Sequence, residues 1–533
     1  MLRSRHIGEM VARPRSPAGA VIPRFYAGRQ VLITGATGFM GKVLVERLLS
    51  TCPDIGHLHL LLRPKKGVPP EKRLQMLKQS QVFDVIRQNR PEQLDKLRMV
   101  AGDIAEPGLG LAPSVLHQLR EVSVVFHSAA TLKFDEPLPM AVRQNVLSAI
   151  RVMELCDQLP HVEVFMHVST AYSNSELSHV EERVYAPPTE LQQLLSLLEV
   201  VPPALLPNIT AQYISPKTNT YTFTKAMAEE AVRIHGNQRY PIGIFRPTIV
   251  VSSLRNPFPG WIENLNGPSG IIAAAGKGLL HVFSVKESAR ADMLPVDIAI
   301  DTLIAASWET AIEKSRDVRV YNCSTYENPT TWGQFENALR FNIREFPMDG
   351  VLWYPSGTGV ENRYTQKVLE FTLQTLPLHA AEYVMRLFGI KRQLSLITAC
   401  QKMRAMNEVL SFFALHEWRF STDNVKKLRA RLTPDDRAIY NLDPNTIQWD
   451  DLYRDFVIGT RKYILKEKDQ DLDEAKRHLR RMYFLHKGAM VFAVLLAFRL
   501  VLQNRYMRDF VYGALRLLMY IVSTTYSRVT AHV

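Results

Sequence analysis

Short runs of apolar and β-branched residues alternate, up to about residue 325, with segments whose apolar positions recur every three or four residues. Runs of the first kind predict strands buried on both faces, and segments of the second kind predict amphipathic helices. Helices such as Lys42–Ser50 and Met140–Gln158 lie between the strands. The pattern therefore predicts an α/β fold with a doubly wound parallel sheet and right-handed crossovers. The expected strands are Val31–Thr34, His59–Leu62, Met99–Gly102, Val122–His127, Val164–Ser169, Ile242–Phe245 and Val320–Cys323.

The pattern changes near Tyr354, after which no further strand is expected and helical periodicity dominates. We therefore divide the chain into a leader (1–21), an α/β domain (22–355), a mostly helical C-terminal domain (356–475) and a tail (476–533). The helices expected after the change are Gln366–Phe388, Ile397–Phe413, Thr422–Leu432 and Trp449–Glu467.

The tail carries two short apolar stretches between basic residues. Gly488–Phe498 is uncharged and is followed by Arg499, and a second stretch, 510–522, is interrupted by Arg516. Neither run reaches the ~18–20 residues that a spanning helix requires, but short apolar runs beside cations suit an anionic membrane surface. We expect a membrane-associating tail, as an interfacial helix or re-entrant hairpin. A tilted span with Arg499 snorkelling, or a pair of core helices, is the alternative.

The net charge of +13 over 533 residues is concentrated at the two ends. Residues 1–30 carry +5 and residues 476–533 carry +9, which leaves −1 for the body. A neutral body argues against a nucleic-acid partner. The four cysteines form no C-x-x-C pair, so neither disulfides nor a metal site are expected and the compartment is a reducing one. The leader lacks an apolar run of signal-peptide length; we expect it to be disordered, with a transit peptide as the alternative.

A glycine-rich turn, Thr34-Gly35-Ala36-Thr37-Gly38-Phe39-Met40-Gly41, follows the first strand and opens the next helix. Glycines at this place let backbone N–H groups approach a pyrophosphate at a helix N-terminus. The turn therefore predicts a dinucleotide site. The residues expected to hold the cofactor are Thr34, Gly35, Thr37, Gly38, Phe39, Met40, Gly41, Arg63, Asp103, Ile104, Ala129 and Lys225.

The end of the second strand indicates which nicotinamide cofactor binds. An acidic residue there would favour NAD by holding a ribose hydroxyl, but the chain reads Leu62-Arg63-Pro64-Lys65-Lys66. Cations at this position match a 2′-phosphate, so we predict NADPH. A solvated basic loop is the alternative.

Tyr221 and Lys225 are four residues apart at the start of an expected helix, Tyr221–His235, and so share one face. A nearby ammonium is expected to lower the pKa of the phenol towards neutrality, as proton transfer requires. Ser169 and Thr170, after the fifth strand, could hydrogen-bond a carbonyl oxygen as it gains charge. Together these residues predict a hydride-transfer site, although a Y-x-x-x-K pair alone is a weak signal.

These motifs resemble the extended short-chain dehydrogenase/reductase class, and longer runs resemble the alcohol-forming fatty acyl-CoA reductases. The runs are VLITGATGFMGKVLVERLL (31–49), GDIAEPGLGL (102–111), VVFHSAATLKFDEPL (124–138), HVSTAYSN (167–174), PGWIENLNGPSG (259–270) and WDDLYRDFVIGTRKYILKE (449–467). They span roughly residues 22–470.

The resemblance implies that a long-chain fatty acyl-CoA is reduced by two NADPH to a primary alcohol through a bound aldehyde. It implies catalytic roles for Tyr221 and Lys225, with Thr170 or Ser169 as a third member, and it matches Asn145 to a helix Asn that assists the lysine. It also implies an enzyme of lipid metabolism that faces the cytosol from a membrane, of the endoplasmic reticulum or the peroxisome. The alternatives are an extended-class enzyme acting on a sterol or sugar nucleotide, and a non-catalytic membrane scaffold.

An insertion, 177–217, separates Thr170 from Tyr221 by more residues than in simple reductases. It is rich in Leu and Pro. We expect either a lid or substrate wall over the site, or a surface excursion that has no part in it.

Overall fold

The computed structural model describes residues 19–236, 239–315, 317–389 and 395–503, with a few further residues between 509 and 519. The leader up to residue 18 and most of the second apolar stretch of the tail lie outside the described residues.

A seven-stranded parallel sheet, with strand order β11-β7-β5-β4-β1-β2-β3, forms the centre of the molecule. Every residue of β2, β4 and β5 is buried, as expected for strands covered on both faces. The strand order reverses beside β1, which has β4 on one side and β2 on the other and therefore opens a crevice at the carboxyl ends of the strands. The predicted fold class is confirmed. The strands are β1 (Gln30–Thr34), β2 (Leu58–Leu62), β3 (Leu97–Ala101), β4 (Val122–His127), β5 (Val164–Val168), β7 (Ile242–Pro247) and β11 (Arg319–Cys323).

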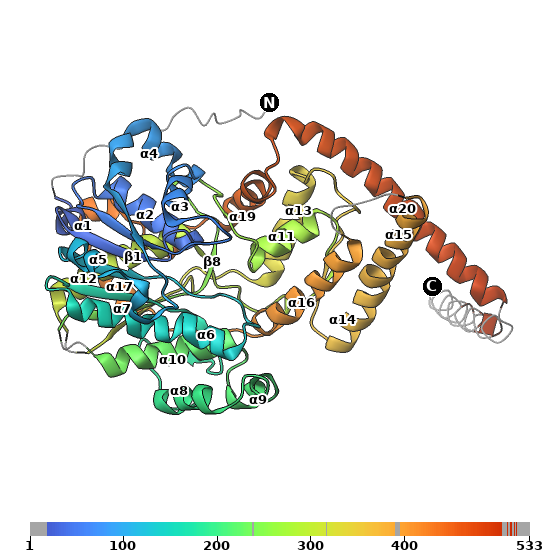
Figure 1. The fold of residues 1–533 in the computed structure, drawn as a ribbon. Helices are drawn as coiled ribbons and strands as arrows, with labels where there is room; N and C mark the ends of the chain where they lie inside the picture. The colour runs from blue at the N-terminus through green and yellow to red at the C-terminus, as the bar shows by residue number, and fades with distance from the viewer. Residues whose placement is uncertain are drawn as a thin grey trace, which may run out of the picture.

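Helices cover both faces of this sheet (Figure 1). On one face α2 (Phe39–Thr51) packs against α12 (Val296–Glu313), and on the other α10 (Thr220–His235) packs against α6 (Leu138–Asn145) and α7 (Leu147–Gln158). The other helices of this part are α1 (Val21–Tyr26), α3 (Pro70–Lys78), α4 (Asp84–Asn89), α5 (Pro113–Gln118), α11 (Pro268–Gly276) and α13 (Trp332–Glu345).

The insertion forms β6 (His179–Val180), α8 (Leu191–Val200) and α9 (Leu206–Tyr213). Leu194 of α8 is buried in one cluster with Phe223 and Met227 of α10. The insertion is therefore a surface layer on the outer side of α10, at the bottom of Figure 1.

After residue 355 the chain is mostly helical, but two short strands occur there. β12 (Thr358–Val360) pairs with β9 (Val282–Ser284), and β13 (Arg419–Phe420) pairs with β6. The expectation that no strand follows Val320–Cys323 is wrong, because strands of two or three residues are too short to show an alternating pattern. A third short pair joins β8 (Ile249–Val251) and β10 (Met293–Pro295).

The C-terminal helices form two groups. α14 (Arg363–Glu370), a π-helical turn (Phe371–Thr375), α15 (Leu376–Leu387) and α16 (Leu396–Leu415) extend away from the central sheet (Figure 1). The second group returns to it: α17 packs on β11 and α12, and α19 packs on α13. The helices of the second group are α17 (Asp423–Arg431), α18 (Pro434–Ile439) and α19 (Trp449–Gly459), the last ending in a π-helical turn (Thr460–Ile464).

The tail begins as a single helix, α20 (Leu472–Gln503), which continues through Arg499. Among the described residues, the helical stretch Asp469–Arg499, which includes most of α20, is the one long and apolar enough to cross a membrane, and its apolar window is not buried against the protein. The helix is longer than the apolar runs alone indicated, because basic residues such as Lys487 interrupt the hydrophobicity without ending the helix.

Candidate functional site

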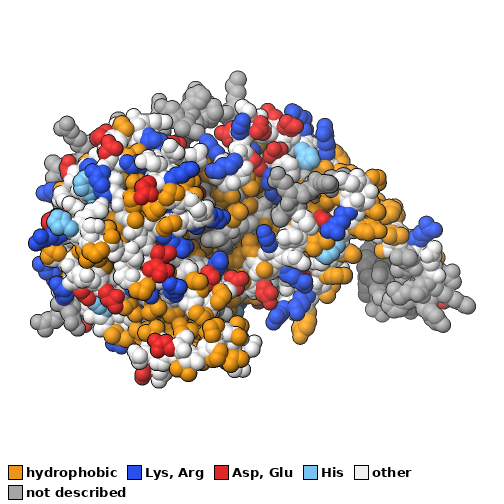
Figure 2. Space-filling view, in the orientation of Figure 1, with side chains coloured by type: hydrophobic (Ala, Val, Ile, Leu, Met, Phe, Trp, Pro, Cys, Tyr) orange, Lys and Arg blue, Asp and Glu red, His pale blue; other side chains and the backbone are white. Residues whose placement is uncertain are grey.

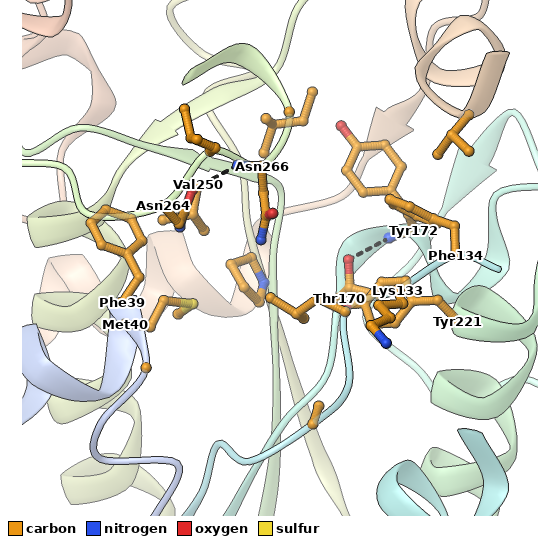
Figure 3. A pocket seen from close by; sticks show the side chains of 18 of the residues that line it. Phe39, Met40, Lys133, Phe134, Thr170, Tyr172, Tyr221, Val250, Asn264 and Asn266 are labelled. Atoms are coloured by element: carbon orange, nitrogen blue, oxygen red, sulfur yellow. Dashed lines mark hydrogen bonds between the residues drawn. The ribbon is translucent and has the colours of Figure 1, made fainter. Parts of the chain in front are cut away.

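A cavity of about 770 Å³ opens at the carboxyl ends of the central strands. Phe39 and Met40, from the glycine turn, lie across it from Thr170 and Tyr221 (Figure 3). Most predicted site residues therefore meet in one place. Those that line the cavity are Gly35, Thr37, Gly38, Phe39, Met40, Gly41, Arg63, Asp103, Ile104, Ala129, Ser169, Thr170, Tyr221 and Lys225.

The glycine turn has the shape that a pyrophosphate requires. Gly35 has a φ of 77°, and a Cβ added there would lie 2.7 Å from the Ala129 nitrogen. A Cβ on Gly41 would lie 2.2 Å from the Gly35 carbonyl oxygen, so the turn tolerates no side chain at either position. No side chain caps the first turn of α2, and no acidic residue lies in it. Its N–H groups can therefore face an anion.

Thr34 was predicted to hold the cofactor, but its side chain is buried behind the turn and is absent from the cavity wall. Its hydroxyl lies 2.9 Å from His127 Nδ1 and accepts a hydrogen bond from the Ala129 N–H. Thr34 therefore joins the turn to the end of β4. The correction arises because residues at the end of a strand alternate between its two faces.

Three cations line the cavity beyond the turn: Arg63, Lys65 and Arg73. Arg63 forms an ion pair with Asp103 at 3.3 Å and is about half exposed. Arg73 donates to the Thr37 hydroxyl at 2.8 Å and to the Arg63 carbonyl oxygen. Burial and the neighbouring Arg63 lower the pKa of Arg73. Sequence reasoning missed Arg73, because nothing in the pattern of α3 distinguishes it from a solvated arginine.

Tyr221, in the first turn of α10, lines the cavity together with Thr170, and the Phe134 ring lies edge-on to it with centroids 5.4 Å apart. Burial raises the pKa of Tyr221 to about 12, although the Thr170 side chain lowers it. We expected Lys225 to lower this pKa towards neutrality, and for the protein alone that expectation is wrong. The Lys225 ammonium instead donates to the Val168 carbonyl oxygen at 2.8 Å, and burial lowers its pKa to about 8.

The two hydroxyls after β5 have different surroundings. Thr170 accepts from the Tyr172 N–H at 3.3 Å, and its side chain lies on the same side of the cavity as Tyr221 (Figure 3). Ser169 donates instead to the buried Glu229 carboxylate, which forms an ion pair with Arg246 at 2.6 Å. Thr170 is therefore the hydroxyl placed to act with the phenol, whereas Ser169 belongs to a polar network behind Lys225.

Asn145 was expected to assist Lys225, but it is buried and absent from the cavity wall. Its Nδ2 donates to Thr224 at 2.9 Å, and its Oδ1 accepts from the Thr131 N–H at 2.9 Å. These bonds tie α6 to α10 and to the loop after β4. Asn145 therefore stabilises the elements that carry Lys225 rather than contacting the ammonium.

The far end of the cavity is apolar, and sequence reasoning did not locate its walls. They come from α11, from the segment that leads into β9, and from α16, which belongs to the protruding C-terminal helices. No described residue of the insertion 177–217 lines the cavity, which favours the surface excursion over the lid or substrate wall. The apolar lining includes Leu265, Ile271, Leu280, Phe283, Met406, Leu410 and Phe413.

Two solved structures share the fold of this chain. The reductase domain of a nonribosomal peptide synthetase from Mycobacterium tuberculosis matches with a TM-score of 0.54 and 18% identity, covering 82% of this chain and 92% of that one. The terminal reductase domain of the myxalamid biosynthetic pathway matches with a TM-score of 0.53 and 17% identity, covering 81% of this chain and 90% of that one. At these identities the likeness establishes the fold alone.

Sequence comparison establishes the family. Two family models, both described as male sterility protein and the first labelled as NAD-binding, match residues 33–303 and 373–467. The chain is 35% identical to fatty acyl-CoA reductase 1 of Gallus gallus over 489 residues, which is 91% of this chain and 94% of that protein. It is 34% identical to the Homo sapiens protein of the same name over the same shares of both chains. This chain belongs to the fatty acyl-CoA reductase family and is a nicotinamide-dependent oxidoreductase.

Proposed function

We propose that this protein reduces a long-chain fatty acyl-CoA to the primary alcohol and free CoA, consuming two NADPH. The observation that carries the proposal is the continuity of one cavity, which runs from the glycine turn past Tyr221 to the apolar wall of α16. A hydride site and a channel for an alkyl chain are therefore joined. A sugar nucleotide would leave the apolar end without a complementary group.

The residues of this site fit NADPH. The glycine turn and the N–H groups of α2 would hold its pyrophosphate, while Arg63 and Arg73 would hold its 2′-phosphate. Asp103 and Ile104 would lie beside the adenine, and Lys225 would bond the nicotinamide ribose. When bound, NADPH supplies the hydride for each reduction.

Thr170 and Tyr221 act on the substrate carbonyl. The Thr170 hydroxyl orients the oxygen that gains negative charge, and the Tyr221 phenol gives that oxygen a proton. In the first reduction hydride adds to the thioester carbon and the C–S bond breaks. The CoA sulfur takes up a proton and CoA leaves as its thiol. In the second, hydride adds to the aldehyde carbon and the oxygen takes the phenol proton, which solvent replaces. A phenol whose pKa is about 12 is protonated at neutral pH, so the proton that the oxygen takes is present.

The test of this function is turnover of palmitoyl-CoA with NADPH in the full-length protein. We expect hexadecanol as the product and two NADPH consumed per alcohol formed, as measured by mass spectrometry and by absorbance. Absence of turnover with every acyl-CoA of a chain-length panel would overturn the proposal.

We further propose that the reductase domain (22–355) and the helical domain (356–475) face the cytosol from the membrane of the endoplasmic reticulum or the peroxisome, held there by the tail (476–533). The apolar, unburied face of α20 supports this proposal. Deleting residues 485–533 should convert a protein that resists alkaline carbonate extraction into one that carbonate releases, because a bilayer-crossing helix is lost. Fractionation of cells that express both forms measures this. If the truncated protein still resisted carbonate, the anchor would lie elsewhere.

The pH dependence of cofactor capture should follow Lys225. The groups near it are the Glu229 carboxylate, which raises its pKa, and His127 and His167, which burial keeps neutral by lowering their own pKa values. Below pH 8 the ammonium is charged and can attract the phosphate-bearing cofactor; above pH 8 it loses its proton. We therefore expect kcat/KM for NADPH to fall as the pH rises through about 8.

The Lys225→Arg variant provides the matched comparison. A guanidinium stays charged throughout this range, so the variant should lose the fall near pH 8 even if its overall rate is lower. A wild-type profile that stayed flat to pH 9.5 would rule out this role for Lys225.

A further inference from the structure

The helix pair α14–α15 buries polar side chains and exposes apolar ones. Gln366, Glu370 and Gln374 occur at four-residue intervals, so they share one face, and that face is turned towards the protein with 8%, 3% and 1% of each residue exposed. Soluble helices usually bury apolar residues and expose residues such as these. In α14–α15 the usual burial of apolar residues and exposure of polar ones is reversed.

The opposite face of the pair is apolar and exposed. Tyr364, Val368 and Phe371 are 83%, 62% and 57% exposed, and the surface continues on α15 through Tyr383, Leu387 and Phe388. Figure 2 shows apolar side chains along the outer arm of the molecule, where α15 and α20 lie. We call these six residues the outer face of α14–α15. An apolar surface of this extent on a soluble protein marks a binding surface.

Specific polar contacts fix the orientation of the pair. Glu370 forms an ion pair with Arg404 of α16 at 3.1 Å and accepts a hydrogen bond from Gln366. The Gln374 side-chain oxygen accepts from the His281 N–H at 3.0 Å, just before β9. Turning the helices over would remove these contacts and leave the buried His281 N–H without its partner. The outer face is therefore held outwards.

The charges around the outer face are cationic. Between residues 363 and 389 the exposed charged side chains are Arg363, Lys367 and Arg386. The two acidic residues of this segment are engaged: Glu370 with Arg404, and Glu382 with Arg386 and the Leu396 N–H. Apolar residues flanked by cations match an anionic lipid surface better than an acidic or neutral protein surface.

α15 is also joined to the start of the apolar part of α20. The loop before β12 joins the two elements: Leu352 packs against the cluster that contains Leu378 of α15, and the Trp353 indole donates to His486 of α20 at 3.0 Å. Tyr354 contacts Tyr483, with ring centroids 5.2 Å apart. Trp and Tyr favour the level of the lipid headgroups. The apolar residues of α20 begin immediately beyond this cluster.

We propose that the outer face of α14–α15 inserts into one leaflet of the membrane beside α20, as a second membrane contact. The contact is interfacial: the apolar side chains enter the acyl boundary while Arg363, Lys367 and Arg386 reach the headgroups. α16 packs against α15 and also lines the apolar end of the cavity, so this contact holds the acyl-binding end of the enzyme at the bilayer. That last consequence rests on the proposed function; the membrane contact itself does not.

The test uses single cysteines in the full-length protein, reconstituted into vesicles of phosphatidylcholine and phosphatidylserine. The four native cysteines are all buried, so a new surface cysteine can be labelled selectively with an environment-sensitive dye. The probe sites are Phe371→Cys and Leu387→Cys. Val494→Cys reports insertion of α20, and Ile234→Cys, an exposed apolar residue on α10, is the control outside any membrane contact. The measurement compares dye emission in ordinary lipid and in lipid with brominated acyl chains.

We expect brominated lipid to reduce emission roughly twofold at both probe sites and at Val494→Cys, with no change at Ile234→Cys, because a dye in the acyl boundary meets bromine directly. Quenching at Val494→Cys alone would overturn the proposal. If emission at the probe sites were the same in both lipids but changed with the number of protein molecules per vesicle, the outer face would contact a second copy of the chain. That result would also overturn the proposal. Loss of quenching at Val494→Cys alone would contradict the proposed anchoring by α20 while leaving the second contact supported.

Discussion

The Tyr221→Phe variant is expected to reduce acyl-CoA at a rate lower by about 10²–10⁴-fold, because general acid catalysis by a positioned group contributes about that much. The phenol lies in the cavity wall with Thr170, and its raised pKa keeps it protonated at neutral pH. A phenylalanine keeps the ring and its edge-on contact with Phe134, so the cavity wall should keep its shape.

Cofactor binding separates loss of the proton donor from loss of the fold. NADPH should bind Tyr221→Phe with nearly the wild-type Kd, as measured by quenching of protein fluorescence. Tyr213→Phe is a matched control, because Tyr213 lies on α9 outside the cavity wall, and it should keep full activity. Wild-type turnover in Tyr221→Phe would remove the phenol from the mechanism and point to Thr170 or a water as the donor.

The sequence predicted the sheet well because its strands are buried on both faces. Such strands read as continuous apolar runs, and β4 has the predicted bounds while β1, β2 and β5 differ by a residue. The glycine turn was equally easy to predict, because glycines in a tight turn between a strand and a helix have few alternative interpretations. Local patterns therefore predicted most of the residues that meet at this end of the cavity.

The parts that were missed depend on tertiary packing. Arg73 reaches the cavity because α3 lies beside the end of β2, and no local pattern records that placement. Ser169 and Thr170 are adjacent in sequence and both line the cavity, yet only the bond from Ser169 to Glu229 of α10 shows which hydroxyl is already engaged. The periodicity of 366–388 predicted a helix, but the expectation that apolar faces turn inwards would have oriented it wrongly.

The second large effect concerns the choice between NADPH and NADH. Replacing both Arg63 and Arg73 by alanine should raise KM for NADPH by about 10²-fold or more, since each charge-assisted hydrogen bond contributes about 1.5–3 kcal/mol. KM for NADH should rise only modestly, because NADH has no 2′-phosphate for these guanidiniums to bind. The measurement is the ratio of kcat/KM for the two cofactors, which should move towards one.

Single variants distinguish the two arginines. Arg63 is half exposed and already shares its charge with Asp103, whereas Arg73 is held by the Thr37 hydroxyl and the Arg63 carbonyl oxygen. Arg73→Ala should therefore also weaken NADH binding modestly, because it loosens the glycine turn through Thr37. Arg63→Ala should weaken the binding of NADPH alone. Lys72→Ala removes an exposed cation from α3, the helix that carries Arg73, and controls for net charge. It should change kcat/KM for neither cofactor. If the wild-type protein used NADH and NADPH with equal efficiency, the 2′-phosphate would have no partner here, and these cations would be no more than a solvated basic surface.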